Sequence, residues 1–131
     1  MIGRKIILPG NPIPLQRARA SRKGFYDPQY KAKENMVWYF KKTYGECEPI
    51  EYPITLEVIF YMPIPKSWSK KKRAAMPGQS HSKKPDLDNC IKMILDTFNG
   101  ILWKDDALIW KIKAMKVYAL EGCTEFIIKE E

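Results

Sequence analysis

Apolar residues recur along the chain with two different periods, and each period predicts a different kind of element. Residues 4–8 are a short β-branched run that ends at a Pro-Gly pair, which predicts a first strand. Residues 53–62 alternate as a strand does, and four of their apolar side chains share one face: Ile54, Leu56, Val58 and Phe60. Because Ile59 and Tyr61 lie on the opposite face, we expect both sides of this strand to be covered at its far end.

Helical spacing first appears after residue 27. Asp27 and Pro28 suit the N-cap and first position of a helix that runs to about Tyr44, with Gly45 just beyond its end. Its expected buried stripe consists of Tyr30, Val37, Phe40 and Tyr44.

Two shorter helices are predicted in the middle of the chain. Ser67 is a suitable cap for a helix over residues 68–76, which a Pro-Gly pair then ends. The other helix covers about residues 89–98, and its apolar face consists of Ile91, Ile94, Leu95 and Phe98.

The C-terminal part predicts two more strands, at residues 107–120 and 124–129. The Glu121-Gly122 turn between them favours an antiparallel hairpin. No internal repeat or linker interrupts the chain, so we expect residues 1–131 to form a single compact domain. The order of elements predicts an α+β fold with a mixed β-sheet and two main helices.

Composition restricts the partners. Lysine and arginine number 23 against 15 acidic residues, which gives a net charge of +8. Such an excess favours a polyanionic partner, either nucleic acid or an anionic membrane surface. No apolar run approaches the roughly 20 residues that span a bilayer, so we expect no membrane association.

Cysteine and histidine usage restricts the chemistry. The three cysteines form no CxxC pair, which fits reduced thiols and a cytoplasmic location. His81 is the single histidine, which disfavours a His/Cys zinc site and a histidine-dependent nucleophilic triad.

Basic residues are concentrated in two segments. No acidic residue occurs between Glu57 and Asp86, where the cations are Lys66, Lys70, Lys71, Lys72, Arg73, Lys83 and Lys84. Arg17 and Arg19 lie in a predicted basic loop over residues 11–23, and we expect them to contact DNA phosphates. For the Lys70 to Arg73 run, a DNA contact and a merely solvated face are both open.

The chemistry-bearing stretch begins at Pro85, which biases the residue before it towards extended geometry. If residues 86–88 are extended, Asp86 and Asp88 share one side, and Asp88 takes the N-cap position of the next helix. Lys92 follows at i+4 from Asp88 and can reach the same pocket. Asp105-Asp106 lies in the connection out of this helix, and we expect it to fold back beside Asp88.

Clustered carboxylates repel one another unless a cation joins them. Hard oxygen ligands suit Mg²⁺, with Mn²⁺ as an alternative. Such an ion can activate water and stabilise charge on a phosphoryl oxygen, as phosphodiester hydrolysis requires, and a neighbouring lysine would help to stabilise the transition state. The alternatives are that Asp88 is only a helix cap and that Asp86 and Asp106 are solvated turn residues.

The run KKPDLDNCIKMILDTFNGILWKDDALI resembles the central motif of RusA-like Holliday junction resolvases, which has the form PD-x-DN-x-x-K, then D, then NG and DD. The similarity extends to PIPLQRAR near the N-terminus and to Lys116-Val117-Tyr118. One departure is Cys90, where the family usually has an apolar residue, and a cysteine can fill a buried position of that kind.

The resemblance implies a homodimeric, Mg²⁺-dependent nuclease with a RusA-like fold that cuts four-way DNA junctions symmetrically. By the same resemblance, Asp86, Asp88 and Asp106 would be metal ligands and Lys92 a catalytic lysine. Two matched cuts and the aromatic run at residues 38–40 also favour a homodimer.

The leading hypothesis is therefore a structure-specific endodeoxyribonuclease that resolves branched DNA in recombination and repair. The expected DNA contacts are Arg17, Arg19, Lys70, Lys71, Lys72, Arg73, Lys83, Lys84 and Lys116. A non-catalytic module that binds branched nucleic acid is the main alternative. An enzyme acting on free nucleotides is a weaker one, since a small substrate needs no such wide basic surface.

Overall fold

The computed structural model describes the backbone of residues 1–131 and every side chain except that of Arg19. Along the chain the elements are β1 (Lys5–Pro9), β2 (Arg19–Ser21), β3 (Gly24–Tyr26), α1 (Tyr30–Tyr44), β4 (Ile54–Pro63), α2 (Lys70–Ala75), α3 (Leu87–Phe98), the 3₁₀ turn η1 (Asp106–Leu108), β5 (Ile109–Ala119) and β6 (Cys123–Lys129). Among the described helices, none is long and apolar enough to cross a bilayer.

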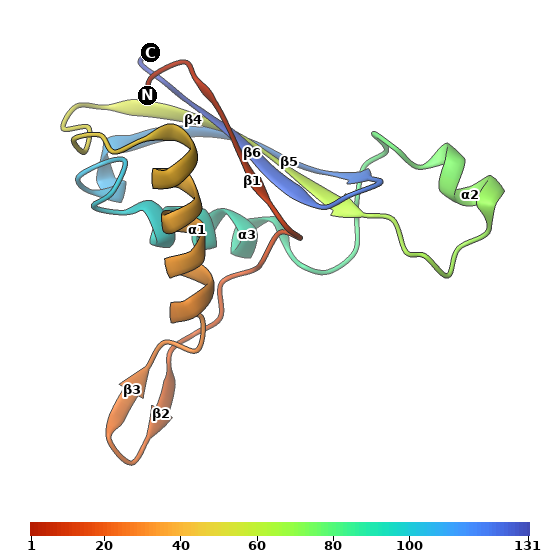
Figure 1. Cartoon of the computed structure of the whole chain (residues 1–131), viewed down its shortest axis with the longest axis horizontal. Helices are drawn as coiled ribbons and strands as arrows, with labels where there is room; N and C mark the ends of the chain where they lie inside the picture. Colours follow the sequence, from red (N-terminus) through yellow and green to blue (C-terminus); the bar gives the residue numbers. More distant parts are fainter.

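Four strands form one sheet in the order β1-β6-β4-β5, and α1 and α3 lie on the same side of it (Figure 1). β4 pairs parallel with β5 and antiparallel with β6, and β6 pairs antiparallel with β1. The predicted α+β domain with a mixed sheet and two main helices is confirmed.

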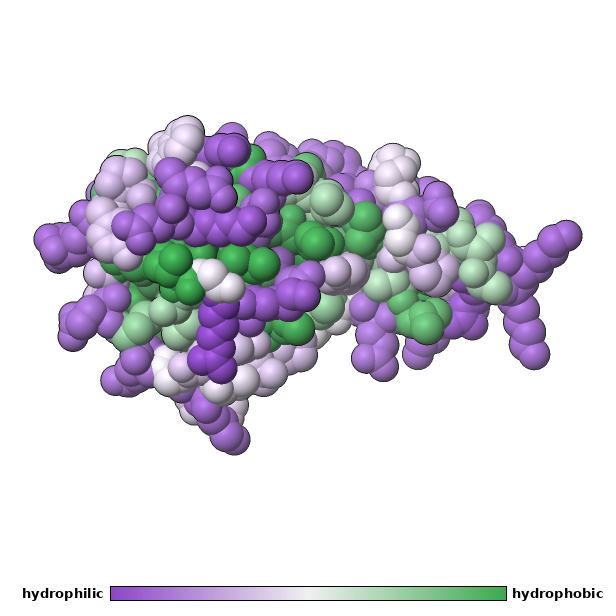
Figure 2. Space-filling model, turned by 90° about the horizontal axis from the view of Figure 1, so that it is seen from above, coloured by the Kyte–Doolittle hydropathy of each residue, from purple (hydrophilic) through white to green (hydrophobic). Residues whose placement is uncertain are grey.

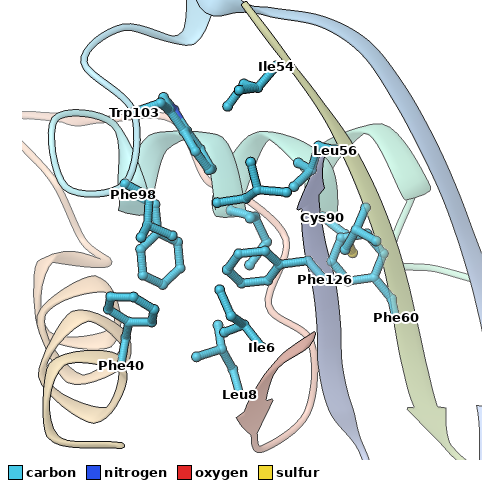
Figure 3. Packing of buried hydrophobic residues seen from close by; sticks show 14 of the residues in the cluster. Ile6, Leu8, Phe40, Ile54, Leu56, Phe60, Cys90, Phe98, Trp103 and Phe126 are labelled. Carbon is cyan, nitrogen blue, oxygen red and sulfur yellow. The ribbon is translucent and has the colours of Figure 1, made fainter. Parts of the chain in front are cut away.

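The hydrophobic core lies between this sheet and the two helices. Alternate residues of β4 are buried on the helix side. Phe98 of α3 packs against Phe40 of α1 and Phe126 of β6, with ring centroids 5.7 Å and 5.6 Å apart (Figure 3). Trp103, which follows α3, is fully buried in the same cluster. The cluster therefore holds α3 along the sheet and determines where its two ends lie.

The opposite face of the sheet is not covered by any described helix. Figure 2 looks onto this face and shows apolar patches between charged side chains. Ile59 and Tyr61 are half-buried there, and the Tyr61 hydroxyl donates to Glu125 at 2.9 Å. The expectation of a strand covered on both sides is therefore wrong. Side chains of neighbouring strands shield these positions instead.

The predicted antiparallel hairpin of the last two strands does not form, because β4 lies between β5 and β6. Phe60 of β4 is in register with Lys116 on one side and Thr124 on the other. The segment predicted as a basic loop, residues 11–23, is not a loop throughout. It contains β2, which pairs with β3 in a small hairpin that projects from the body (Figure 1).

Helix α1 begins at Tyr30, later than predicted. Asp27 accepts the backbone N–H of Gln29 at 2.8 Å, and this turn precedes the helix, whose N-cap residue is Gln29. Tyr30 is 67% exposed, so the expected buried stripe is wrong at that position, whereas Phe40 is fully buried. The predicted end at Tyr44, with Gly45 as the cap, is confirmed.

Candidate active site

The N-terminal end of α3 carries two of the predicted metal ligands. The helix begins at Leu87, so Asp86 is its N-cap residue and Asp88 lies in the first turn. The predicted extended segment with Asp88 as the cap is therefore wrong, because helical geometry begins directly after Asp86. Both carboxylates are exposed to solvent.

Lysines surround these two carboxylates. The Nζ of Lys84 lies 2.8 Å from Oδ1 of Asp86. This ion pair holds the pKa of Asp86 below its usual value, and the charge of Lys116 acts in the same direction. The Nζ of Lys92 lies 3.8 Å from Oδ2 of Asp88, as the i, i+4 spacing predicted. Two carboxylates and a reachable lysine thus face solvent at this end.

Two other segments hold the loop that leads into α3. The ammonium of Lys116 on β5 donates to the carbonyls of Lys83 and Pro85 at 2.7 Å and 2.6 Å. The backbone N–H of Leu15 donates to the carbonyl of Asn89 at 2.9 Å. Between these segments lies a hollow of about 470 Å³, lined by Pro12, Pro14, Leu15, Lys84, Pro85, Asp86 and Asn89. Nothing local in the sequence signals that Lys116 supports this loop.

Asp106 lies at the other end of α3, in η1. Its Oδ1 accepts from the indole N–H of Trp103 at 2.7 Å, and its backbone N–H donates to Oδ1 of Asn99 at 3.1 Å. Burial raises the pKa of Asp106, and the neighbouring charges of Asp105 and Asp96 add to that rise. Asp105 has a different role, because its side chain caps η1 by accepting the N–H of Ala107.

The three proposed ligands do not meet within one chain. α3 has 12 residues and is therefore about 18 Å long. Two oxygens bound to one Mg²⁺ lie within roughly 4 Å of each other, twice the Mg–O distance. Among the described residues, no three His, Cys, Asp or Glu side chains are placed to hold a metal ion. The expectation that Asp106 folds back beside Asp88 is wrong within a single chain, because Trp103 and Asn99 hold it at the far end.

Lys33 of α1 links the two helices. Its Nζ lies 2.7 Å from Oδ2 of Asp27 and also pairs with Asp96 on α3. Burial lowers the pKa of Lys33, but the two ion pairs outweigh it and the pKa is raised. No local pattern in the sequence indicates this role of Lys33. The role of Asp96 is to pair with this lysine.

The largest basic segment forms a lobe around α2 at one end of the molecule (Figures 1 and 2). α2 is shorter than predicted, and Ser69 rather than Ser67 caps it. Trp68 lies beneath two cations, with Nζ of Lys72 3.8 Å and Nζ of Lys83 5.1 Å from its ring centroid. Trp68 also packs on Tyr118 of β5, which attaches the lobe to the sheet.

His81 is part of the same attachment. Its ring lies 4.7 Å from that of Tyr118, and burial lowers its pKa, as do the charges of Lys116 and Lys83. His81 is therefore a partly buried packing residue.

The predicted DNA contacts fall into separate groups. Lys70, Lys71 and Lys72 are exposed on α2, whereas Arg73 is half-buried. Arg17 is exposed in the segment before β2, and the side chain of Arg19 lies outside the described residues. Because β2 and α2 project from different parts of the molecule, these groups do not form one basic face on a single chain (Figure 1).

Comparisons with known proteins identify the family of the chain. The family model described as endodeoxyribonuclease RusA matches residues 9–129. A relative from Bacillus subtilis (strain 168), described as uncharacterized protein YqaN, is 33% identical over 138 residues, which cover 96% of this chain and 95% of the relative. The match includes both ends of α3 and the α2 lobe. The chain belongs to the RusA endodeoxyribonuclease family.

Proposed function

We propose that the chain is a Mg²⁺-dependent, structure-specific endodeoxyribonuclease of the cytoplasm. It resolves Holliday junctions or related branched DNA by paired phosphodiester hydrolysis, in DNA recombination and repair. The family match over residues 9–129 is the observation that carries this proposal.

The residues around α3 supply groups suited to this reaction. Asp86, Asp88 and Asp106 are the proposed metal ligands, and Mn²⁺ is the expected alternative to Mg²⁺. A divalent ion held by carboxylates lowers the pKa of water and stabilises charge on phosphoryl oxygens. Lys92 is the proposed catalytic lysine. Its side chain is 60% exposed, so its ammonium group can approach the scissile phosphate and stabilise the charge that develops there.

Binding of the junction is assigned to the basic groups on both sides of α3. Ammonium and guanidinium groups would neutralise phosphates and make affinity depend on salt. The proposed contacts are Arg17, Arg19, Lys70, Lys71, Lys72, Arg73, Lys83, Lys84 and Lys116. Lys116 donates to backbone carbonyls in the free chain, so its contribution would come through the loop that it supports.

A homodimer is part of the proposal. Resolution needs two matched cuts on a substrate with two-fold symmetry, and a two-fold dimer presents two matched sites. In a dimer the basic groups of both chains would surround one junction, which a single chain does not achieve.

The direct test is incubation of the purified protein with an end-labelled four-way junction in Mg²⁺, with a linear duplex of the same sequence as the control. Paired cuts across the junction are expected, and EDTA should abolish them. Junction binding without cleavage, in either Mg²⁺ or Mn²⁺, would instead indicate a non-catalytic binding module.

A further inference from the structure

The β2–β3 hairpin projects from the body and exposes an aromatic ring to solvent (Figure 1). We propose that this hairpin recognises the crossover point of branched DNA, where Phe25 stacks on base faces that a continuous duplex would cover. The inference rests on the proposed function and deepens it, since it names the part of the branched substrate that is recognised and the residue that recognises it.

Arg22 and Lys23 form the tip of the hairpin. Ser21 of β2 is in register with Gly24 of β3, which leaves these two cations at the turn. The Ser21 hydroxyl donates to the carbonyl of Gly24 at 2.9 Å and accepts the backbone N–H of Lys23 at 3.3 Å. Gly24 has a φ of 109°, a conformation that favours glycine. Local hydrogen bonds and a glycine thus hold two positive charges at the tip.

Phe25 lies directly behind this tip. It is in register with Ala20, whose methyl group is too small to cover an aromatic ring. Phe25 is 81% exposed, and the next residue, Tyr26, is 48% exposed. A ring exposed to this extent contributes little hydrophobic stabilisation to the free chain, because it leaves water only when a partner covers it. The hairpin therefore presents an aromatic surface that is available for binding.

The charge of this region favours DNA as the partner. No acidic residue precedes Asp27 in the sequence, and the side chains of Arg17, Arg22 and Lys23 are exposed. These cations suit phosphates, whereas a phenylalanine ring suits the face of a base. In a linear duplex each base is covered on both faces by its neighbours. Where strands exchange between duplex arms this stacking is interrupted, so an aromatic ring beside cations fits the crossover better than a continuous duplex.

The segment that enters the hairpin is fixed to both helices. Gln29, at the start of α1, is 7% exposed. Its side chain donates to the carbonyl of Pro14 at 2.7 Å and accepts the backbone N–H of Gln16 at 2.8 Å. Between these two residues, the N–H of Leu15 donates to the carbonyl of Asn89 in the first turn of α3. The hairpin therefore starts from the same end of α3 that carries Asp86 and Asp88.

The segment that leaves the hairpin is held as well. Asp27 directly follows β3 and pairs with Lys33 at 2.7 Å, and Lys33 also pairs with Asp96 on α3. A fully extended strand from Leu15 places Arg22 at most about 23 Å away. At roughly 3.4 Å for each base pair, this length corresponds to about seven base pairs of duplex. A hairpin at the crossover would thus keep the N-terminal end of α3 near phosphates a few base pairs from it.

Binding measurements separate this role from general affinity for DNA. Phe25→Ala should weaken binding to a four-way junction by about 10-fold, because a stacked ring is lost, and should leave the affinity for a linear duplex of the same sequence unchanged. Phe25→Tyr should bind the junction as the wild type does, since it keeps the ring. Fluorescence anisotropy in EDTA measures both affinities without any contribution from cleavage.

Two further variants serve as controls. Tyr52→Ala removes an aromatic side chain that is 42% exposed outside the hairpin, and it should leave both affinities unchanged. Arg22→Ala removes a charge at the tip and should weaken junction and duplex binding by similar factors. Thermal unfolding of Phe25→Ala should match that of the wild type, because the ring is exposed.

Contact with the bases can be observed directly. The fluorescence of 2-aminopurine depends on its stacking, so a probe at the crossover should change its emission when the wild type or Phe25→Tyr binds. Phe25→Ala should not cause this change. The same probe in the middle of a duplex arm should respond to none of the three proteins.

Each other outcome contradicts one of the two proposals. If Phe25→Ala weakens junction and duplex binding equally, or weakens neither, the stacking role is wrong even where the wild type cuts junctions. A shift of Phe25→Ala from dimer to monomer in sedimentation velocity would assign the ring to a protein interface and also overturn it. If the junction preference depends on Phe25 but the wild type cuts no junction in Mg²⁺ or Mn²⁺, the crossover contact stands and the proposed nuclease function fails.

Discussion

The two ends of α3 carry carboxylates in opposite environments. Asp86 is exposed, and its pKa is lowered by the ion pair with Lys84. Asp106 is partly buried and bonded to Trp103, and its pKa is raised by burial. One end is therefore an open, lysine-rich surface that a substrate can approach, and the other is a rigid position held by the core.

Removing a ligand charge at either end should have the largest effect. Asp88→Asn and Asp106→Asn are each expected to lower the rate of junction cleavage by at least about 1000-fold, because the ion loses an anionic ligand. Junction binding should persist or strengthen, since less negative charge faces the phosphates. Cleavage assays and gel-shift titrations in Mg²⁺ measure the two effects.

Asp105→Asn is the matched control, because an asparagine can still cap η1. Its cleavage rate should stay within a few-fold of wild type. An Asp88→Asn enzyme that cuts at the wild-type rate would show that the ligand assignment is incorrect.

Lys92→Ala tests the role of the lysine at the exposed N-terminal end of α3. We expect the single-turnover cleavage rate to fall by about 100-fold with a far smaller change in junction affinity, the pattern of a group that acts on the transition state. Lys31→Ala, an exposed lysine on α1, serves as the control. Equal losses of binding and cleavage would make Lys92 an ordinary phosphate contact.

Lys116→Met tests how the open end is positioned. The substitution leaves the carbonyls of Lys83 and Pro85 without their charged donor, so the free energy of unfolding should fall by about 2 kcal/mol. Cleavage should fall as well, because the loop carrying Lys84 and Asp86 loosens. Lys113→Met changes an exposed lysine on the same strand and should do neither. Urea unfolding and cleavage rates separate the two variants.

Lys33→Met should have the smallest effect of these substitutions. Lys33 pairs with Asp96, close to the end of α3 that is held by the core. The hydrogen bond from Lys33 lowers the pKa of Asp27, so the stabilisation is present above the ordinary value of 3.8 and is lost as the pH falls through the lowered pKa. The variant should be less stable by about 1 kcal/mol at pH 7. This difference should shrink below pH 3.8, as thermal unfolding across pH would show. A difference independent of pH would assign the effect to packing.

Local patterns in the sequence were sufficient to predict most of the helices and strands. Ile94 and Phe98 are buried and Ile91 and Leu95 partly buried, as the helical spacing of α3 predicted. The central strand and the i, i+4 contact between Asp88 and Lys92 also followed from period alone. These features depend on neighbours a few residues apart, so periodicity is enough to predict them. The candidate residues themselves came from a motif of the same local kind, and their roles remain predictions.

Contacts between distant segments were decided only by the tertiary structure. A Glu-Gly turn favours a hairpin, but β4 is largely buried, pairs with both C-terminal strands and lies between them. Lys116 is 31 residues from Pro85, and no local pattern shows that its ammonium holds that carbonyl. Asp106 follows α3 closely in sequence, yet its bond to the buried Trp103 keeps it at the opposite end of α3 from Asp86 and Asp88. The sequence by itself determined the periods of the elements and the order of the candidate residues, whereas competition among strands and side chains for the core decided how far apart those residues lie.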